Sequence, residues 1–457
     1  MKTLLSIIML TTSILGATWN TDSDPTPAEV QALVNGASAG DTISIAAGAF
    51  SWGSGVTIGD RINIKGQGGR NGTTKITVTV GGFDVFHFTG FTATETLTIS
   101  GIEFNLLDDT SNTSAVETSS CTLDQLIITD CEFHYGSSQL LLAGAKGVVY
   151  ECNSYNPIKF ISYTAGTTAQ ANESWDDLTA GTNDALFIED NNIYWNSDYN
   201  ESYSQETIGT FNGGKLVIRY NAWDGTGYPN STTVDPIMTH GSAGAGVTDG
   251  YWQIGTGARR GQSVVEIYNN TVTATRVDTL CILRGSTNLV YNNTLDTATH
   301  NPVILLREEE QDGGQWNPAR TAWPAEDQVH NSFFWNNVLR LNGTPNSNYV
   351  SVQSGSETYI QEDRDYWMNE PASSGGSESF TGKNGGSSAY PTDGVRHPTL
   401  GNMTFSSSGA NAHYPYTPYN YPHPLRTQAG STYTGQIKLD GSGAKPSTSN
   451  GAKFDLN

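Results

Sequence analysis

A short sequence motif that recurs along this 457-residue chain constrains its fold more than any other feature of the sequence. Each copy is a β-type run that closes on a polar pair, followed by one residue and then a large apolar one. The asparagines in the aligned copies lie 23 to 49 residues apart, so a unit of 23 residues carries variable insertions, which is typical of a solenoid. The aligned column reads Ile102, Cys131, Asn153, Asn192, Asn221, Asn270, Asn293 and Asn337.

A second β-type run lies between successive copies of this segment, and no helical period separates the two runs. Two or more short strands in each turn of the chain predict a parallel β-solenoid. The recurring asparagines fit this fold, because side-chain amides stacked at a bend can bond to one another at the ~4.8 Å spacing of neighbouring strands. Glycosylation or turn formation is the alternative interpretation of these asparagines. Examples of the second run are FDVFHFTG (83–90), PIMTHG (236–241), LCILRG (280–285) and VILLRE (303–308).

The stretch PAEVQALVNGASAGDTISIAAGAF (27–50) resembles the capping helix and first strand of the pectate-lyase-like superfamily. The segment TPYNYPHPL (417–425) is similar to the tail of many secreted proteins of this group. The resemblance implies an all-β, right-handed parallel β-helix of about nine or ten coils, with an N-terminal capping helix and an irregular C-terminal tail. It specifies the fold strongly and the activity weakly, because the superfamily contains polysaccharide lyases, glycoside hydrolases, esterases, phage tailspikes and noncatalytic adhesins.

The chain divides into four segments by composition and pattern. The apolar run 4–15 behind Lys2 predicts a signal peptide and a secreted protein. A membrane anchor is the alternative, although the run is shorter than the ~20 residues needed to span a bilayer. The predicted segments are a signal peptide at 1–17, an N-terminal cap helix at 18–40, the β-helix at 41–368, and a Gly/Ser/Pro/Tyr-rich tail at 369–457 that wraps or caps the solenoid.

Charge and motifs exclude several partners and cofactors. With 23 Lys and Arg against 45 Asp and Glu, the net charge of -22 repels a phosphate backbone and argues against nucleic acid as a partner. Four cysteines are too few for a disulfide framework; Cys131 and Cys152 are candidates for one pair, and Cys281 is expected to be a buried thiol. No CxxC, HExxH or Gly-rich phosphate loop supports zinc or nucleotide chemistry.

A basic column at the end of the second run is the candidate catalytic site. Equivalent positions of successive coils are neighbours in a parallel β-helix, which would bring His240, Arg284 and Arg307 together, with Asp235 and Asp278 opening the same strands. The lyases of the superfamily imply that Arg284 or Arg307 is the base or carboxylate clamp and that His240 shuttles the proton. They also imply Ca²⁺ on Asp235 and Asp278. Alternatively, the arginines cap carbonyl groups at the turn or pair with the acids at 308–310.

Three long insertions, 164–184, 242–263 and 308–331, leave the end of this same strand and would form a wall along one face. Aromatic side chains at intervals along a groove suit the stacking of a sugar chain, so the insertions predict a glycan cleft. The alternative is that the tryptophans anchor the insertions to the solenoid. The predicted substrate contacts are Trp175, Trp252, Arg260 and Trp316.

These features predict a secreted protein that binds and cleaves an extracellular polysaccharide. A lyase that acts on an acidic glycan by β-elimination is preferred to a hydrolase, and calcium is the one cofactor that we expect. No nucleic-acid partner and no membrane span are expected. The alternative function is that of a noncatalytic surface, matrix or fibre protein that uses the rigid solenoid for adhesion or self-association.

Overall fold

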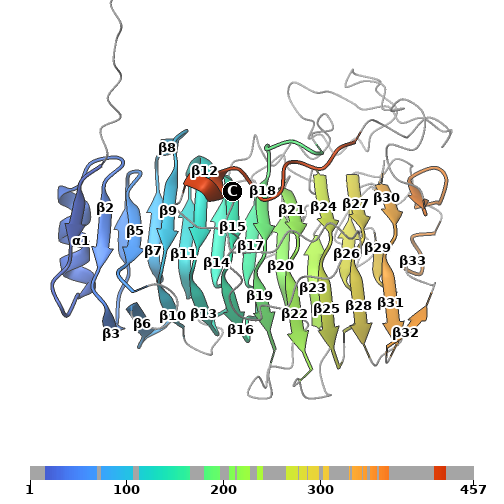
Figure 1. Cartoon of the computed structure of the whole chain (residues 1–457), viewed down its shortest axis with the longest axis horizontal. Coiled ribbons are helices and arrows are strands. Elements are labelled where there is room, and N and C mark those ends of the chain that lie inside the picture. The colour runs from blue at the N-terminus through green and yellow to red at the C-terminus, as the bar shows by residue number, and fades with distance from the viewer. Residues whose placement is uncertain are drawn as a thin grey trace, which may run out of the picture.

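The computed structural model forms a solenoid in which successive coils pass through three sheets (Figure 1). This is the right-handed parallel β-helix that the sequence predicts. No helix among the described residues has the length and apolar character needed to cross a membrane. The structure describes residues 16–68, 74–106, 113–164, 180–195, 205–211, 214–226, 234–239, 264–275, 277–285, 287–297, 302–307, 329, 332–341, 343–346, 350–357, 360–369 and 416–428.

Sheet A has apolar side chains on both of its faces. Its strands, in spatial order, are β1 (Thr18–Asn20), β2 (Thr42–Ile45), β5 (Asn63–Gly66), β9 (Leu97–Ser100), β12 (Thr122–Thr129), β15 (Ala145–Tyr150), β18 (Leu186–Glu189), β21 (Lys215–Arg219), β24 (Val264–Tyr268), β27 (Thr287–Tyr291), β30 (Ser332–Trp335) and β34 (Tyr366–Met368); β8 (Thr92–Ala93) pairs with β12. One face joins the interior of the solenoid, and the other forms a second apolar cluster on the outside.

Sheet B follows sheet A in each coil and alternates between inward apolar and outward polar residues. Its strands are β3 (Gly48–Trp52), β6 (Thr74–Val78), β10 (Glu103–Asn105), β13 (Glu132–His134), β16 (Asn153–Tyr155), β19 (Asn192–Tyr194), β22 (Ala222–Gly225), β25 (Thr271–Ala274), β28 (Thr294–Thr297), β31 (Val338–Leu341) and β32 (Thr344–Asn346). All of its pairs are parallel except β31 with β32, which is antiparallel.

Sheet C contributes one strand to each coil, and its ten strands in the described part of the chain match the predicted number of coils. The described strand residues of every run that the sequence analysis placed between repeats lie in this sheet. Its strands are β4 (Val56–Ile58), β7 (Asp84–Thr89), β11 (Ser114–Ser119), β14 (Leu140–Ala143), β17 (Ile161–Thr164), β20 (Gln205–Phe211), β23 (Val234–Thr239), β26 (Cys281–Arg284), β29 (Ile304–Arg307) and β33 (Val350–Val352).

The polar pair in each repeat is the bend between sheet A and sheet B. Its first residue takes the left-handed conformation, with φ between 54° and 58° at Asp190, Tyr220, Asn269, Asn292 and Asn336. Asparagine and aspartate tolerate this conformation better than most residues, which explains their frequency there. Each repeated segment is therefore two strands joined by a sharp bend.

The second residue of the bend forms a buried asparagine ladder. Each side-chain amide donates to the side-chain oxygen of the next asparagine at 2.9 to 3.1 Å, through Asn191, Asn221, Asn270, Asn293 and Asn337. The predicted ladder is correct from Asn221 onward.

The prediction is wrong by one residue at the first two asparagines, because the ladder position there is held by Cys152 and Asn191. Asn153 and Asn192 instead bond to each other on sheet B, at 3.1 Å. The error comes from aligning the copies on Tyr155 and Tyr194 as their large apolar residues, although both rings lie on the outward face. A shift of one residue exchanges the two faces of a strand.

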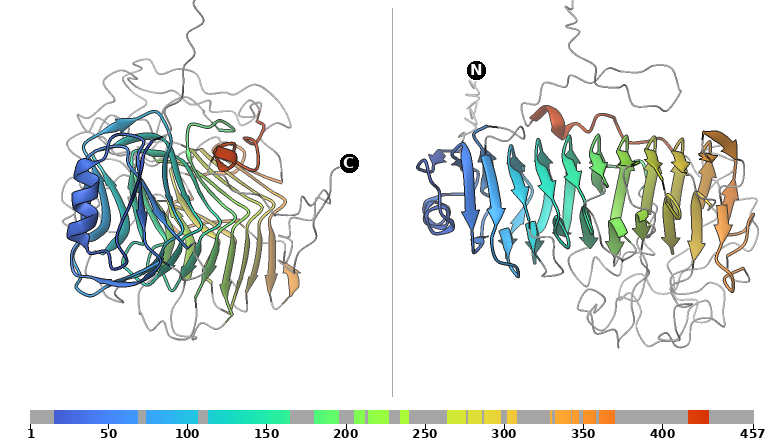
Figure 2. Two further views of the ribbon diagram at one scale, coloured as in Figure 1. Left: turned by 60° about the vertical axis from the view of Figure 1, so that its left-hand side comes forward. Right: turned by 90° about the horizontal axis from the view of Figure 1, so that it is seen from below.

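A capping helix, α1 (Pro27–Gly36), covers the N-terminal end of the solenoid (Figure 2). It is shorter than the predicted 18–40, because Thr18–Asn20 form the strand β1, which pairs with β2 in sheet A. Thr26 caps its first turn by accepting the backbone N–H of Glu29, and Val30 and Val34 are buried. The amide of Gln31 both donates to the carbonyl and accepts the N–H of Thr57 on the edge strand β4, at 2.9 and 2.8 Å. The helix therefore satisfies edge groups that would otherwise be open to another strand.

The four cysteines are all buried free thiols. The proposed pair of Cys131 and Cys152 is not a disulfide, and each thiol donates to a backbone carbonyl oxygen of its own coil, that of Thr129 or Tyr150. Cys281 is a buried thiol, as predicted, and burial raises its pKa. The coils around these cysteines are therefore held together by hydrophobic packing and hydrogen bonds rather than by disulfides.

Candidate functional site

Residues 416–428, which we call the strap, cover the outer face of sheet A from β12 to β27 (Figure 1). Tyr416 at one end bonds to Tyr291 on β27, and the helix α3 (Leu425–Gln428) at the other end contacts β12 and β15. Apolar side chains of sheet A, among them Val148 and Phe187, pack beneath it. This face is therefore closed to a substrate where the strap lies.

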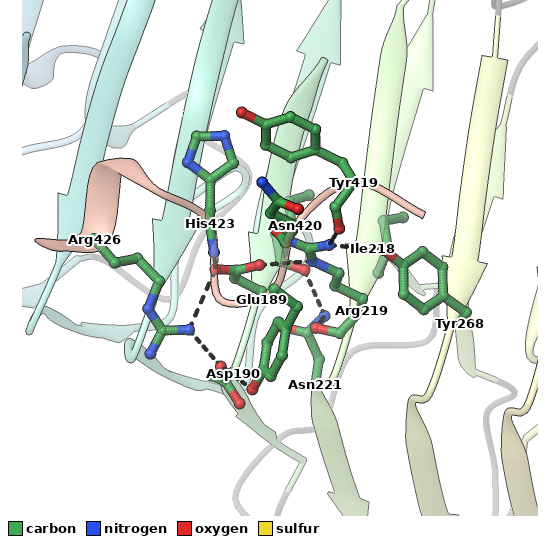
Figure 3. Close-up of polar contacts among 12 residues, drawn as sticks. Glu189, Asp190, Ile218, Arg219, Asn221, Tyr268, Tyr419, Asn420, His423 and Arg426 are labelled. Carbon is green, nitrogen blue, oxygen red and sulfur yellow. Dashed lines mark hydrogen bonds and ion pairs between the residues drawn. The ribbon is translucent and has the colours of Figure 1, made fainter. Parts of the chain in front are cut away.

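A buried ion network fixes the strap to the sheet (Figure 3). Glu189 on β18 accepts the Nε–H of Arg219 at 2.7 Å and an Nη1–H of Arg426 at 3.2 Å. Its Oε1 also accepts the backbone N–H of His423 at 2.8 Å. Arg219 donates in turn to the carbonyl oxygens of two strap residues, Tyr419 and Asn420, at 2.7 Å.

Burial and neighbouring charges shift the pKa values of Arg219 and His423 in this network. Burial alone lowers the pKa of Arg219, but Glu189 and Tyr268 together more than offset this effect, so the pKa lies above its ordinary value. Burial lowers the pKa of His423 to about 3, and Arg219 and Arg426 add to the shift. The His423 ring is therefore neutral, and its Nδ1 accepts the N–H of Leu425. The network holds the strap against the sheet.

Sheet B presents a ladder of stacked side chains. The rings of His134, Tyr155 and Tyr194 stack with centroids 4.7 and 4.9 Å apart and planes 6° and 15° from parallel. Rings that stack on one another along the solenoid present their edges outward, whereas sugars stack on faces. Glu103, Glu132 and His134 lie close enough to hold a metal ion, but the ammonium of Lys75 already pairs with Glu103.

Sheet C brings together two of the predicted catalytic residues. Arg284 and Arg307 are direct neighbours in the parallel register at the ends of β26 and β29. Arg284 is only 4% exposed, whereas Arg307 is half-buried and thus the more accessible of the two. The backbone N–H of Arg284 donates to Thr239 Oγ1 at 2.9 Å, which ties β26 to β23.

The other predicted contacts of this site are not described by the structure. The chain leaves β17, β23 and β29 directly into the predicted insertions. His240, Trp175, Trp252, Arg260 and Trp316 all lie outside the described residues, so their roles stay predictions.

The predicted calcium ligands lie at different depths. Asp235 is buried and lies in β23 two residues before the inward Ile237, and its charge contributes to the raised pKa of the core thiol Cys281. Asp278 precedes β26 and is half-buried. Among the described residues, neither belongs to a group of acidic or histidine ligands whose atoms lie within 4.8 Å of one another. This placement gives no calcium geometry, and calcium dependence stays a prediction.

The N-terminal half of sheet C carries a second polar group, which the sequence analysis missed. Asp84 and His87 lie on β7, and Glu117 and Ser119 on the neighbouring β11. Burial and a hydrogen bond to Glu117 raise the pKa of Asp84 to about 8. The sequence places the two pairs some thirty residues apart, and only the strand register brings them together.

No protein-family model matches the chain, and no curated protein matches it as a relative. Among solved structures, a PL6 family alginate lyase, AlyGC, is similar at 12% identity with a TM-score of 0.37, over 93% of this chain and 60% of the lyase. The catalytic domain of a GH87 alpha-1,3-glucanase, in complex with tetrasaccharides, is similar at 11% identity with a TM-score of 0.24, over 80% of this chain and 70% of that domain. Values this low do not bear on function, and none of these comparisons supports the pectate-lyase-like label, which stays a prediction.

Proposed function

We propose that the protein is secreted and that it binds and cleaves an extracellular polysaccharide along the outer face of sheet C. The observation that carries this proposal is the direct pairing of Arg284 with Arg307 at the strand ends from which the insertions leave. The other two faces suit a polymer less well, because the strap covers much of sheet A and stacked ring edges line part of sheet B.

An acidic polysaccharide is the substrate class that suits two adjacent guanidinium groups. Arginine binds carboxylates through two parallel N–H donors, and a neutralised uronate carboxylate makes the neighbouring carbon-bound proton more acidic. Arg307 is the proposed carboxylate clamp because it is the more exposed, and Arg284 supports it from the adjacent strand. His240 stays the proposed proton shuttle, and no step of this scheme requires calcium.

Ultraviolet absorbance of the unsaturated product tests β-elimination directly. The purified chain is incubated with pectate, alginate, glycosaminoglycan and neutral glycans, with and without Ca²⁺. Arg307→Ala should abolish the rise in absorbance, and Arg307→Lys should restore only part of it. Arg340→Ala is the matched control, because Arg340 is an exposed arginine on sheet B. The proposal fails if the four proteins act alike.

The noncatalytic alternative predicts a different set of results. The ladders on sheet B and the 4% exposure of Arg284 suit a rigid scaffold as well as an enzyme. In that case no glycan is cleaved, neither an unsaturated product nor new reducing ends appear, and the chain still sediments with insoluble polysaccharide or with itself. New reducing ends without unsaturated product would instead identify a hydrolase.

A further inference from the structure

A hydroxyl, an imidazole and a pair of carboxyl groups form a line across β7 and β11. His87 Nε2 lies 2.7 Å from the Oγ of Ser119, and its Nδ1 lies 3.6 Å from Asp84 Oδ2 and 3.7 Å from Glu117 Oε2. The imidazole therefore stands between an acid and a hydroxyl, which is the arrangement of a nucleophile with its general base and orienting acid. The His87 side chain is 32% exposed and Ser119 is half-buried, so a substrate can reach them.

Rigid strands hold these side chains in place. His87 is in register with Glu117, and Thr89 with Ser119, while the alternate residues Phe86 and Phe88 of β7 are fully buried in the core. The outward side chains thus have fixed backbone positions on a packed sheet. Sites on such elements keep their geometry better than sites on loops.

The charge around His87 favours the productive proton arrangement. Burial and the hydrogen bond to Glu117 raise the pKa of Asp84 to about 8, so Asp84 is mostly protonated at neutral pH and the two acids can lie side by side near Nδ1. A proton on Nδ1 leaves Nε2 free to accept the Ser119 O–H at 2.7 Å. The Ser119 hydroxyl can also donate to Thr89 Oγ1 at 3.3 Å, and the shorter distance favours His87 as the acceptor of its single proton. The flanking strands β4 and β14 place Thr57 and Leu141 beside this pair, neither of which titrates near neutral pH.

The turn after Ser119 is unusual for this sheet. The residues that follow β7, β14 and β26 are Gly90, Gly144 and Gly285, all with positive φ. The residue that follows β11 is Ser120, which has a φ of 53°. A non-glycine residue in this region carries backbone strain, which proteins often retain beside functional groups.

We propose that Ser119, His87 and the Asp84–Glu117 pair hydrolyse O-acyl esters. Ser119 Oγ attacks the ester carbonyl carbon while its proton passes to His87 Nε2; the bond to the alcohol then breaks, and the alcohol oxygen takes that proton. Water attacks the acyl-serine, gives a proton to His87, and releases the carboxylic acid as Ser119 regains its proton. The identification of the alcohol as a glycan hydroxyl rests on the proposed function. The cleavage of the ester does not depend on that function.

A synthetic acetate ester tests this site without any glycan. The full chain is assayed with p-nitrophenyl acetate, and the modified residue is located by mass spectrometry after reaction with a fluorophosphonate. Ser119→Ala and His87→Asn should each lower kcat/KM by about 100-fold or more, and the label should be on Ser119. His134→Asn is the control for a half-buried surface imidazole beside a carboxylate, and it should keep the wild-type rate.

Three outcomes would overturn the proposal. The first is equal ester hydrolysis by wild type, Ser119→Ala and His134→Asn, and the second is a label on another residue. The third is tight binding of Zn²⁺ or Ca²⁺ that His87→Asn abolishes, without ester turnover, which would make Asp84, His87 and Glu117 a metal site instead. Circular dichroism verifies that the variants fold, and Ser119→Cys keeps a nucleophile that iodoacetamide should alkylate faster than the four buried thiols.

Discussion

Replacing Glu189 with leucine tests whether the buried ion network holds the strap on sheet A. The carboxylate accepts three hydrogen bonds, and neither it nor Arg219 is exposed to solvent at all. Removing one partner of a buried ion pair costs about 3–5 kcal/mol. We expect a loss near the lower end, about 3 kcal/mol, because Arg219 keeps its bonds to Tyr268 and the strap, and Arg426 keeps those to acidic neighbours.

Urea unfolding and trypsin sensitivity measure the two consequences. Arg426 is buried, so tryptic cleavage after it reports release of the strap, and Glu189→Leu should accelerate that cleavage. The double variant Glu189→Leu with Arg219→Leu should lose less free energy of unfolding than the two single variants lose in sum, by on the order of 2 kcal/mol. Glu95→Gln, which removes an exposed carboxylate that pairs with Arg61, is the control and should cost less than about 1 kcal/mol. Strict additivity, or unchanged cleavage at Arg426, would refute this account.

Three further changes test other parts of the structure. The raised pKa of Asp84 means that the folded state holds a proton which the unfolded state releases, so its contribution to stability is lost as pH rises from about 4 to 8. Asp84→Asn should therefore raise the free energy of unfolding at pH 8 by on the order of 2 kcal/mol and change it little at pH 4. The control Asp124→Asn, on the exposed surface, should show no such difference between the two pH values. Equal effects of Asp84→Asn at both pH values would contradict this reasoning. Asn270→Ala removes a buried ladder amide and should lower the free energy of unfolding in urea by about 2–4 kcal/mol. Asn192 is half-buried, and Asn192→Ala should lower it by less than about 1 kcal/mol. Equal losses would argue against a stabilising role of the ladder. Gly147→Ala should abolish soluble expression or lower the melting temperature strongly, because φ is 129° and the new Cβ would lie 2.1 Å from a backbone oxygen; wild-type stability would contradict this.

The solenoid could be predicted from the sequence because its signals are local. Apolar runs and polar bends recur within each coil, and sheets A and C follow from them directly. The shift at Asn153 and Asn192 shows where local signals fail. Inward and outward residues alternate, and the outward rings of Tyr155 and Tyr194 resemble core residues when only size and hydrophobicity are considered.

The polar groups of the candidate sites were harder to predict because they depend on register and on distant contacts. Arg284 and Arg307 were paired correctly, since both end similar apolar runs. The contact of Ser119 with His87 needs the exact alignment of β7 and β11, and neither residue belongs to a recognisable motif. The strap contacts strands more than 200 positions earlier in the chain, and no sequence period indicates that they meet.

The strap also changes how the coils depend on one another. A repeat array is held by contacts between adjacent coils, so it can fray from either end one coil at a time. A single segment that reaches from α3 at β12 to Tyr416 at β27 joins the intervening coils across their outer face. Those coils should open together, as one hydrogen-exchange unit. Because the strap follows the solenoid in the chain, this cooperative unit is completed last during synthesis, after the coils that it joins have formed.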